Sequence, residues 1–250
     1  MSFIFKETPR LFGLVHISFL ILIILFNIVL NSYVRNLKED RLLKLLHYIG
    51  LAMLVSEVFK QIFCFYYVFD KTINLWFFPW QLCSMAMYLS FIAIYLNKNK
   101  QNTILVYLST FSIVGTIIAL ILPYDMLRDQ IPLVFHSFIY HGLIISIGII
   151  AIHILKNRNN YNFRSSIILF IITAFIAEII NVIAHYLIHD IKREPDMFYI
   201  NPFMQTTQPI FGCIAAKYGN TIEIIIYLSS IIIGSYLIYL IIHNLLKMTK

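Results

Sequence analysis

The sequence has few charged residues and few cysteines, and both shortages exclude common classes of protein. Only 12% of its 250 residues are charged, whereas soluble domains average roughly 25%. No repeat or low-complexity tract appears, and no soluble domain stands out. The three cysteines, Cys64, Cys83 and Cys213, are odd in number and lack metal-ligand spacing, so no disulfide framework is indicated. We expect neither a metal nor a cofactor.

The apolar residues, 60% of the chain, gather in long continuous runs. Each run reaches the roughly 20 residues that cross a hydrocarbon core, and continuous runs exclude an alternating β-barrel. The sequence therefore predicts an all-α polytopic membrane protein in which residues 1–250 form one bundle of seven transmembrane helices. The expected spans are residues 11–34, 42–69, 75–96, 103–123, 132–155, 165–189 and 221–246.

Basic residues predict the orientation. Eleven lysines and arginines fall on one side of these spans and seven on the other. Because the richer side is normally cytoplasmic, we expect the N-terminus outside and the C-terminus inside. The net charge of +7 lies in short loops, which does not suggest nucleic acid as a partner.

The connection over residues 190–220 is unusually apolar, but it is short and broken by proline. Asn-Pro and Gln-Pro pairs within it are turn signals. We expect it to form an interfacial or partly re-entrant segment on the outer face, since irregular backbone at membrane depth must be covered by protein.

The stretch from Trp76 to Cys83 holds both tryptophans of the chain, a residue type that favours the membrane interface. Proline is tolerated in the first helical turn, so we expect a helix to begin at Pro79 with Cys83 about one turn inside it. The positive end of the helix dipole would favour thiolate there. Alternatively, Cys83 is a small buried apolar residue.

Polar side chains interrupt three of the expected spans. Glu57, Lys60 and Gln61 share one helical face with Cys64, and Glu57 and Lys60 can form an ion pair. Such a pair either fixes helix packing or belongs to a site, because intramembrane charges usually face a bundle interior or a wet cavity.

The fifth and sixth spans carry further polar groups. His136 and His141 lie about 140° apart around their helix, so we expect one to face a cavity and the other to have an orienting or structural role. Glu178, Asn181 and His185 form one stripe on the sixth span.

Counted from the outer ends of the spans, these groups and Cys83 lie at similar depth in one leaflet. We therefore expect a polar pocket there, to which the first, fourth and seventh spans contribute almost nothing. The fourth span is expected to face lipid, with Gly115 allowing a close helix approach. His16 and Asn27 in the first span are expected to be structural.

A cysteine near a histidine is the minimum constellation for nucleophilic catalysis. The histidine takes the thiol proton, and a carboxylate or amide orients the histidine. Free N–H groups in the first turn after Pro79 could stabilise a developing oxyanion.

Residues 81–89, which read Gln-Leu-Cys-Ser-Met-Ala-Met-Tyr-Leu, resemble the YwaF-type integral membrane proteins of bacteria. The seven-span layout, His136 with His141, and Asn181 with the proline-rich connection after it are similar too. That family is related to the vertebrate transmembrane protein 164, a phospholipid acyltransferase with a cysteine nucleophile. In the bacterial pattern a histidine often precedes the Leu-Cys pair, where this chain has Gln81.

The resemblance implies that Cys83 forms a thioester with an acyl chain taken from a membrane phospholipid, in a bacterial cell membrane. His141 is the best match for the catalytic histidine. A lysolipid or water would then accept the acyl group.

The leading hypothesis is therefore a lipid acyltransferase or acyl-lipid hydrolase working through Cys83 and His141, or His136. Lining or orienting residues would be Gln81, Glu57, Lys60, Glu178, Asn181 and His185. A proton-coupled transporter or channel using the ionisable groups, and a non-catalytic membrane scaffold, remain alternatives.

Overall fold

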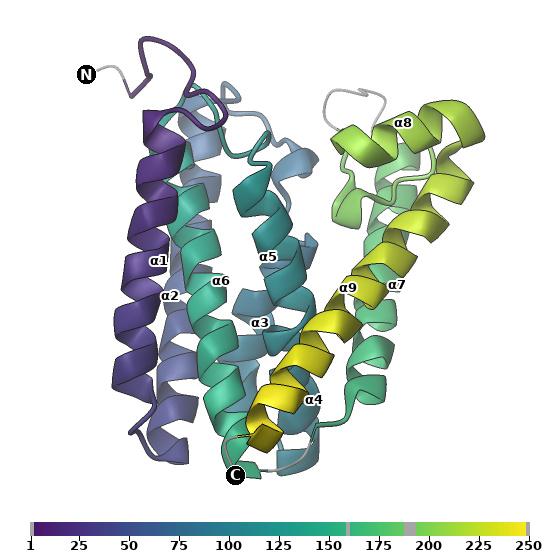
Figure 1. The fold of residues 1–250 in the computed structure, drawn as a ribbon. Helices are drawn as coiled ribbons and strands as arrows, with labels where there is room; N and C mark the ends of the chain where they lie inside the picture. Colours follow the sequence, from purple (N-terminus) through teal and green to yellow (C-terminus); the bar gives the residue numbers. More distant parts are fainter. Residues whose placement is uncertain (1–2, 159–160, 188–193, 249–250) are drawn as a thin grey trace.

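The computed structural model describes residues 3–158, 161–187 and 194–248 and consists almost entirely of helices. Residues 188–193, which include the expected end of the sixth span together with Lys192 and Arg193, lie outside the described residues. The α-helices are α1 (Leu14–Val34), α2 (Glu39–Tyr67), α3 (Met85–Ile92), α4 (Lys98–Ser109), α5 (Phe111–Ile121), α6 (Ile131–Arg158), α7 (Phe163–Leu187), α8 (Pro209–Tyr218) and α9 (Asn220–Met248). Figure 1 shows the two termini at opposite ends of the bundle.

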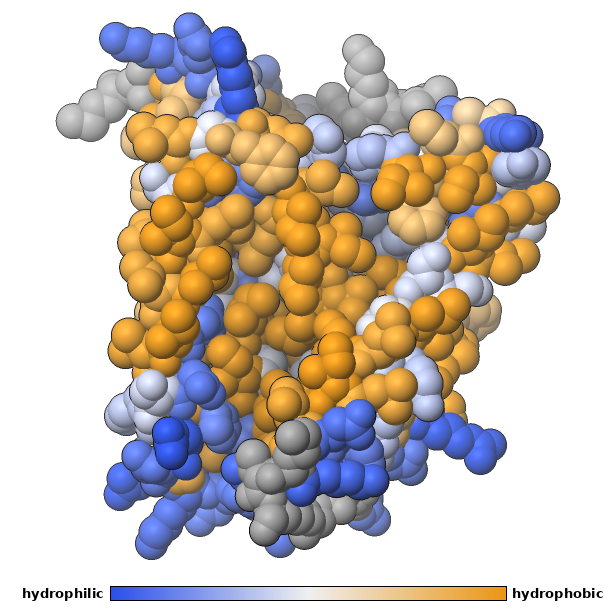
Figure 2. All heavy atoms as spheres, viewed as in Figure 1, coloured by the Kyte–Doolittle hydropathy of each residue, from blue (hydrophilic) through white to orange (hydrophobic). Residues whose placement is uncertain are grey.

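Six helices are long and apolar enough to cross a membrane, so the prediction of an all-α polytopic membrane protein is confirmed. They are Leu14–Val34, Glu39–Tyr67, Lys98–Ile121, Ile131–Arg158, Phe163–Leu187 and Asn220–Lys247. On the face drawn in Figure 2, an apolar belt separates two hydrophilic ends. This is the pattern expected of a protein surrounded by lipid.

The third passage differs from the expected helix over residues 75–96. Its helical part runs only over Leu82–Tyr95 and rises about 21 Å, which is less than the roughly 30 Å of a hydrocarbon core. The residues before it form a 3₁₀ turn at Leu75–Phe77 and then a bent, non-helical segment to Gln81. Seven long spanning helices are therefore not present in the part of the chain that the structure describes.

The fourth passage is broken and buried, and the expectation that it faces lipid is wrong. Thr110 interrupts the helix with φ −124° and ψ −75°, and this separates α4 from α5. In the most apolar window of this passage 67% of the residues are buried, against 17% for α1 and for α9. The hydrophobic run looked lipid-facing, but it lies at the centre of the bundle because the other helices surround it.

Close backbone approaches and buried amides hold the bundle together. A Cβ on Gly50 of α2 would lie 2.4 Å from Ser90 Oγ on α3, so only glycine fits this contact. Asn27 of α1 donates to Gly142 O and accepts from Ser146 Oγ, both on α6. His16 bonds Leu120 O, so both polar residues of the first span have the structural role expected of them.

The end of the bundle opposite the N-terminus is closed by a buried arginine at the last position of α6. Arg158 donates to Glu39 Oε1 through Nε at 3.0 Å and through Nη2 at 2.6 Å. Its other bonds go to Gln101 Oε1 (2.6 Å) and Asn102 Oδ1 (2.9 Å). This network joins α2, α4 and α6.

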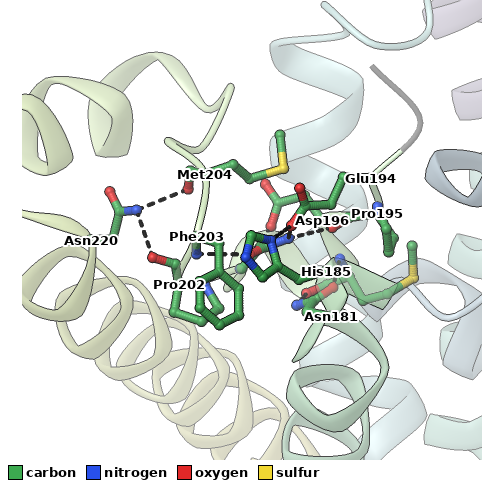
Figure 3. Close-up of polar contacts among 11 residues, drawn as sticks. Asn181, His185, Glu194, Pro195, Asp196, Pro202, Phe203, Met204 and Asn220 are labelled. Carbon is green, nitrogen blue, oxygen red and sulfur yellow. Dashed lines mark hydrogen bonds and ion pairs between the residues drawn. The ribbon is translucent and has the colours of Figure 1, made fainter. Parts of the chain in front are cut away.

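The described part of the long connection after α7 folds back over the N-terminal end of the bundle and leads into α8 (Figure 1). Asn220, the first residue of α9, donates to Pro202 O and Met204 O at 3.0 and 3.1 Å (Figure 3). The Phe203 ring stacks on His185 of α7, with 3.8 Å between ring centroids. The connection is thus held against α7 by Phe203 and against α9 by Asn220.

Candidate active site

A cavity of about 230 Å³ lies at the end of the bundle that carries the N-terminus. Its walls come from α2, the segment before α3, α5 and the loop after it, α6, the long connection, α8 and α9. In Figure 2 the surface is hollowed between the part formed by α5 and the part formed by α8 and α9. The chemistry-bearing residues that line it are Glu57, Lys60, Gln81, Cys83, Asp125, Arg128, His136, Tyr140, His141, Tyr199 and Tyr227.

Cys83 is the second residue of the helical turn that starts at Leu82, with Gln81 as the N-cap. The first backbone hydrogen bond of this turn runs from Ser84 N to Gln81 O at 2.8 Å. Because the earlier N–H groups of a helix have no intrahelical acceptor, the amides of Leu82 and Cys83 remain donors beside the thiol. A Cβ on Gly115 would lie 3.0 Å from Leu82 Cδ2 and 3.9 Å from Cys83 Sγ, so glycine permits the expected close approach.

The sequence predicts a helix that begins at Pro79, but in the structure the first helical turn begins at Leu82. The residues around Pro79 form a tight turn instead, in which Trp80 N donates to Phe78 O at 2.8 Å, and tertiary contacts hold this turn in place. The Tyr88 hydroxyl donates to Pro79 O at 3.0 Å, and the Trp80 indole donates to Thr173 O of α7 at 3.2 Å. Cys83 therefore lies nearer the positive end of its helix than predicted.

Both histidines of α6 line the cavity, whereas only one was expected to face it. The cavity follows a wide arc of α6, from Leu133 to His141, so residues 140° apart can both reach it. His141 Nδ1 lies 2.7 Å from Ser137 O. Since a carbonyl only accepts, Nδ1 holds the proton and Nε2 is left as the basic nitrogen. His136 Nε2 is buried without a partner among the described residues.

The predicted ion pair on α2 is present. Lys60 Nζ lies 2.6 Å from Glu57 Oε1, with the side chains 18% and 7% exposed. Gln61 Nε2 also donates to Glu57 Oε1 at 2.8 Å and to Phe77 O at 2.5 Å. These bonds connect the charged face of α2 to the segment that leads to Cys83.

Gln81 and Asn181 hold one loop between them. Gln81 donates to Asp196 O and accepts from Phe198 N, each at 2.8 Å. Asn181 donates to Met197 O at 3.1 Å and accepts from Met197 N at 2.7 Å. This double amide clamp supports Phe198 at φ 58°, a left-handed conformation that is uncommon outside glycine. The two amides thus position backbone, and Asn181 itself does not line the cavity.

The other two predicted residues of α7 also lie outside the cavity wall. His185 Nδ1 is 2.8 Å from Glu194 Oε1, and Glu194 also accepts from Asn201 (Figure 3). Glu178 Oε2 is buried without a partner among the described residues. The three residues of the α7 stripe therefore have separate roles: Asn181 holds the loop, His185 anchors the connection, and Glu178 lies beside Asn181 with its Oε2 unpartnered among the described residues.

Several lining residues escaped the sequence analysis. Asp125 and Arg128 lie in the short loop between α5 and α6. Tyr199, in the connection, donates through its hydroxyl to Asp125 Oδ2 at 2.9 Å. Pro123 and Pro132 mark the two ends of this loop in the sequence. Charged residues between two such helix-end signals were the available clue that the loop could contribute to the site.

The fourth and seventh spans also contribute more than expected. α5 supplies Gly115, Ile118 and Ala119, and α9 supplies Tyr227 and Ile231. Their contribution is mostly apolar surface, so a search for ionisable groups could not find it. α2 and α6 supply the ion pair and the histidines, whereas α5 and α9 supply mostly apolar side chains.

The family comparison covers nearly the whole chain. A model of the TMEM164 family matches residues 11–244. The chain belongs to the TMEM164 family. The match confirms the relationship to transmembrane protein 164, while the YwaF-type assignment stays a resemblance. Searches of curated proteins and of solved structures found no match.

Within this TMEM164 family chain, the cavity brings together a thiol, a basic imidazole nitrogen and free amide donors. The side chains of Tyr140, Tyr199 and Tyr227 line the same cavity as Cys83. A nucleophile, a base and an oxyanion binder are the elements of acyl transfer. No cluster of three metal-ligating side chains occurs among the residues described.

Proposed function

We propose that this protein is a membrane-embedded lipid acyltransferase or acyl-lipid hydrolase that works through a thioester on Cys83. The observation that carries the proposal is the convergence of Cys83, His136 and His141 on one cavity. The polar lining of the cavity comes from α2, the segment before α3, the loop after α5, α6, the long connection and α9, in an otherwise apolar chain. Residues of this kind at membrane depth are costly unless they have a function or a partner.

The reaction would start with transfer of the thiol proton from Cys83 to His141 Nε2. The sulfur then attacks the carbonyl carbon of an acyl ester, and the amides of Leu82 and Cys83 donate to the oxyanion. When the ester C–O bond breaks, the departing oxygen takes the proton from His141 and leaves as the hydroxyl of a lysolipid.

A second hydroxyl completes the cycle. An acceptor lysolipid or a water molecule gives its proton to His141 and attacks the thioester carbonyl. The C–S bond breaks, the sulfur regains the proton, and the product is a new acyl ester or a free fatty acid. His136 lies on the same wall and is the second candidate for the base.

The cavity suits a lipid because its lining is both polar and apolar. α5 and α9 supply mostly apolar side chains, whereas α2 and α6 supply the ion pair and the histidines. An ester linkage lies between the polar and apolar parts of a phospholipid, so an amphipathic cavity can hold the reacting carbonyl near the thiol. The hollow between α5 and α8–α9 in Figure 2 would admit the chains from the side.

The same proposal includes orientation and location. The end with the cavity would face the outside of a bacterial cell membrane, with the C-terminus in the cytoplasm. The charge bias supports this orientation. A reporter fused after the last residue should then be accessible only from the cytoplasm, and outside accessibility would reverse the assignment.

A transporter reading has less support from the geometry. It would need Glu57, Lys60, His141, Glu178 and His185 along one path, but Glu178 and His185 do not line the cavity. The non-catalytic scaffold reading does not account for the unpartnered nitrogen of His136.

Acyl labelling tests the proposal. The purified protein, incubated with phospholipid carrying a labelled acyl chain, should acquire a hydroxylamine-sensitive label on Cys83. Cys83→Ser, which nearly preserves side-chain volume, should remain folded and unlabelled, whereas Cys213→Ser on exposed α8 is the matched control and should label normally. Full acyl exchange or hydrolysis by Cys83→Ser would rule out the thioester mechanism.

A further inference from the structure

Arg128 is a lining residue of the cavity that the proposed chemistry does not use. It lies three residues before α6, in the loop that follows α5. Its Nε donates to Asp125 O at 2.7 Å, and its guanidinium lies 4.7 Å from the centroid of the Phe77 ring. Two contacts, one to backbone and one to an aromatic face, therefore fix the side chain.

Neither contact neutralises the charge. Among the described residues no carboxylate lies within ion-pair distance of Arg128. The Asp125 carboxylate is close in sequence, but it accepts from the Tyr199 hydroxyl. The Nε bond uses one of five guanidinium N–H donors, and the planar fork of the remaining donors matches phosphate oxygens.

The other cation of the cavity is in a different situation. Lys60 lies 5.9 Å from the centroid of the same Phe77 ring, but Glu57 neutralises it. The ionisable lining therefore contains two cations and two carboxylates, Glu57 and Asp125. Lys60 is held in an ion pair with Glu57, whereas Arg128 has no carboxylate within ion-pair distance among the described residues, so its free N–H donors can bind an anionic group of a ligand.

The order of residues along α6 agrees with the order of groups in a phospholipid. Arg128 precedes the helix, while His136 and His141 lie roughly 7 and 15 Å along it. In a phospholipid the acyl esters lie between the phosphate and the chains. A phosphate held before the helix would therefore direct an ester toward the histidines and Cys83.

We propose that Arg128 binds the phosphate of the phospholipid whose acyl ester reacts in the cavity. This assignment rests on the proposed function and makes Arg128 the residue that selects phospholipids over neutral acylglycerols. A bidentate Arg–phosphate contact is both stronger and more directional than a neutral hydrogen bond.

Binding can be measured without turnover in the Cys83→Ser background. Native mass spectrometry of the detergent-purified protein would compare dioleoylphosphatidylcholine with dioleoylglycerol, which has the same chains and no phosphate. Arg128→Gln should lower retention of the phospholipid roughly tenfold, the loss expected for one charge-assisted contact, and leave dioleoylglycerol unchanged. Arg128→Lys should give an intermediate loss, because it keeps the charge without the fork.

Lys217→Gln is the matched control. Lys217 lies on α8 at the same end of the protein and is also placed over an aromatic ring, that of Tyr218 at 5.1 Å. It is exposed and does not line the cavity, so its loss should leave both lipids bound as before. Thermal unfolding of each variant would confirm that the fold is retained.

The outcomes separate this inference from the proposed function. Equal loss of both lipids in Arg128→Gln, or no loss of either, would overturn the phosphate assignment. Displacement of the phospholipid by millimolar inorganic phosphate alone would make Arg128 a free-anion site and also overturn it. Selective loss of phospholipid, in a protein whose Cys83 is never acylated, would support the Arg128 assignment while refuting acyl transfer.

Discussion

Two arginines lie near the two ends of α6, and their surroundings differ. Arg158, at the last position, has a side chain only 7% exposed and bonds to Glu39, Gln101 and Asn102. Arg128, before the first position, has a backbone bond, a ring contact and no carboxylate partner among the described residues. Arg158 uses four of its five N–H donors within the protein and stabilises the fold, whereas Arg128 keeps most of its donors available to a ligand in the cavity.

The same contrast applies to the histidines of α6. His153, in the half of α6 that ends at Arg158, bonds the Asn31 side chain through Nε2 at 2.8 Å. His141 uses Nδ1 for its own helix and leaves Nε2 toward the cavity. His153 thus uses its Nε2 to hold α6 against α1, while His141 keeps its Nε2 available in the cavity.

The largest expected effect comes from the histidine pair. His141→Gln should slow acylation of Cys83 by about 10²–10⁴-fold, because it removes general-base assistance. His153→Gln should leave the rate unchanged, because that imidazole is far from the cavity. Single-turnover labelling with acyl-labelled phospholipid measures both rates. A normal rate in His141→Gln, with a slow rate in His136→Gln, would transfer the base role to His136.

The arginine pair should give the largest difference in stability. Arg158→Met leaves Glu39, whose side chain is 28% exposed, without its ion-pair partner and leaves Gln101 and Asn102 without their donor, so we expect a loss toward the lower end of the about 3–5 kcal/mol measured for broken buried pairs. Arg128→Met removes no ion pair and should change the free energy of unfolding by no more than about 0.5 kcal/mol. Denaturant titration in detergent would measure both. Equal destabilisation by the two changes would contradict the contrast between the two ends.

These contrasts mark what the sequence could reveal. Charges inside long apolar runs are visible in the sequence, so Glu57, Lys60, Cys83 and the histidines were identified as neighbours before the structure. Arg128 looked like any boundary arginine, because its exposure to a cavity depends on how the loop after α5 folds over Phe77. Only tertiary structure distinguishes it from a solvated charge.

The fold, like the site, could be predicted only in part from the sequence. Hydrophobic length located six spans, and most of their ends lie within a few residues of the expected ones. The third span failed because contacts distant in sequence, such as the bond of the Trp80 indole to α7, override the helical preference of the residues around Pro79. The break at Thr110 had no local signal such as proline or glycine.

The Glu57–Lys60 ion pair on α2 lies at the end with the cavity, and we expect its loss to have an effect of intermediate size. Glu57→Gln leaves Lys60 unpaired and should destabilise the protein toward the lower end of about 3–5 kcal/mol, because Lys60 is 18% exposed. Adding Lys60→Met should recover the folded yield, since no charge is then left alone. A Glu57→Gln protein that folds normally but no longer acylates Cys83 would place the pair in the site.

The smallest expected effect concerns Asp196, whose backbone the amide clamp holds. Its Oδ1 accepts from Asn201 N at 2.9 Å, and its Oδ2 is buried without a partner among the described residues. Burial raises the pKa of Asp196 to about 7, and the nearby carboxyls of Glu223, Asp125 and Glu178 add to the shift. The folded protein therefore favours the neutral acid.

The sign of the pH effect follows from that shift. Between the unfolded pKa near 3.8 and the folded pKa near 7, the folded state binds the proton more tightly, so stability of the loop falls as pH rises through this range. Hydrogen exchange at Met197 N and Phe198 N, corrected for intrinsic rates, should show weaker protection at pH 8 than at pH 6. Asp196→Asn keeps the acceptor and cannot ionise, so its protection should not change with pH. A pH response of equal size in Asp196→Asn would show that another group controls the loop.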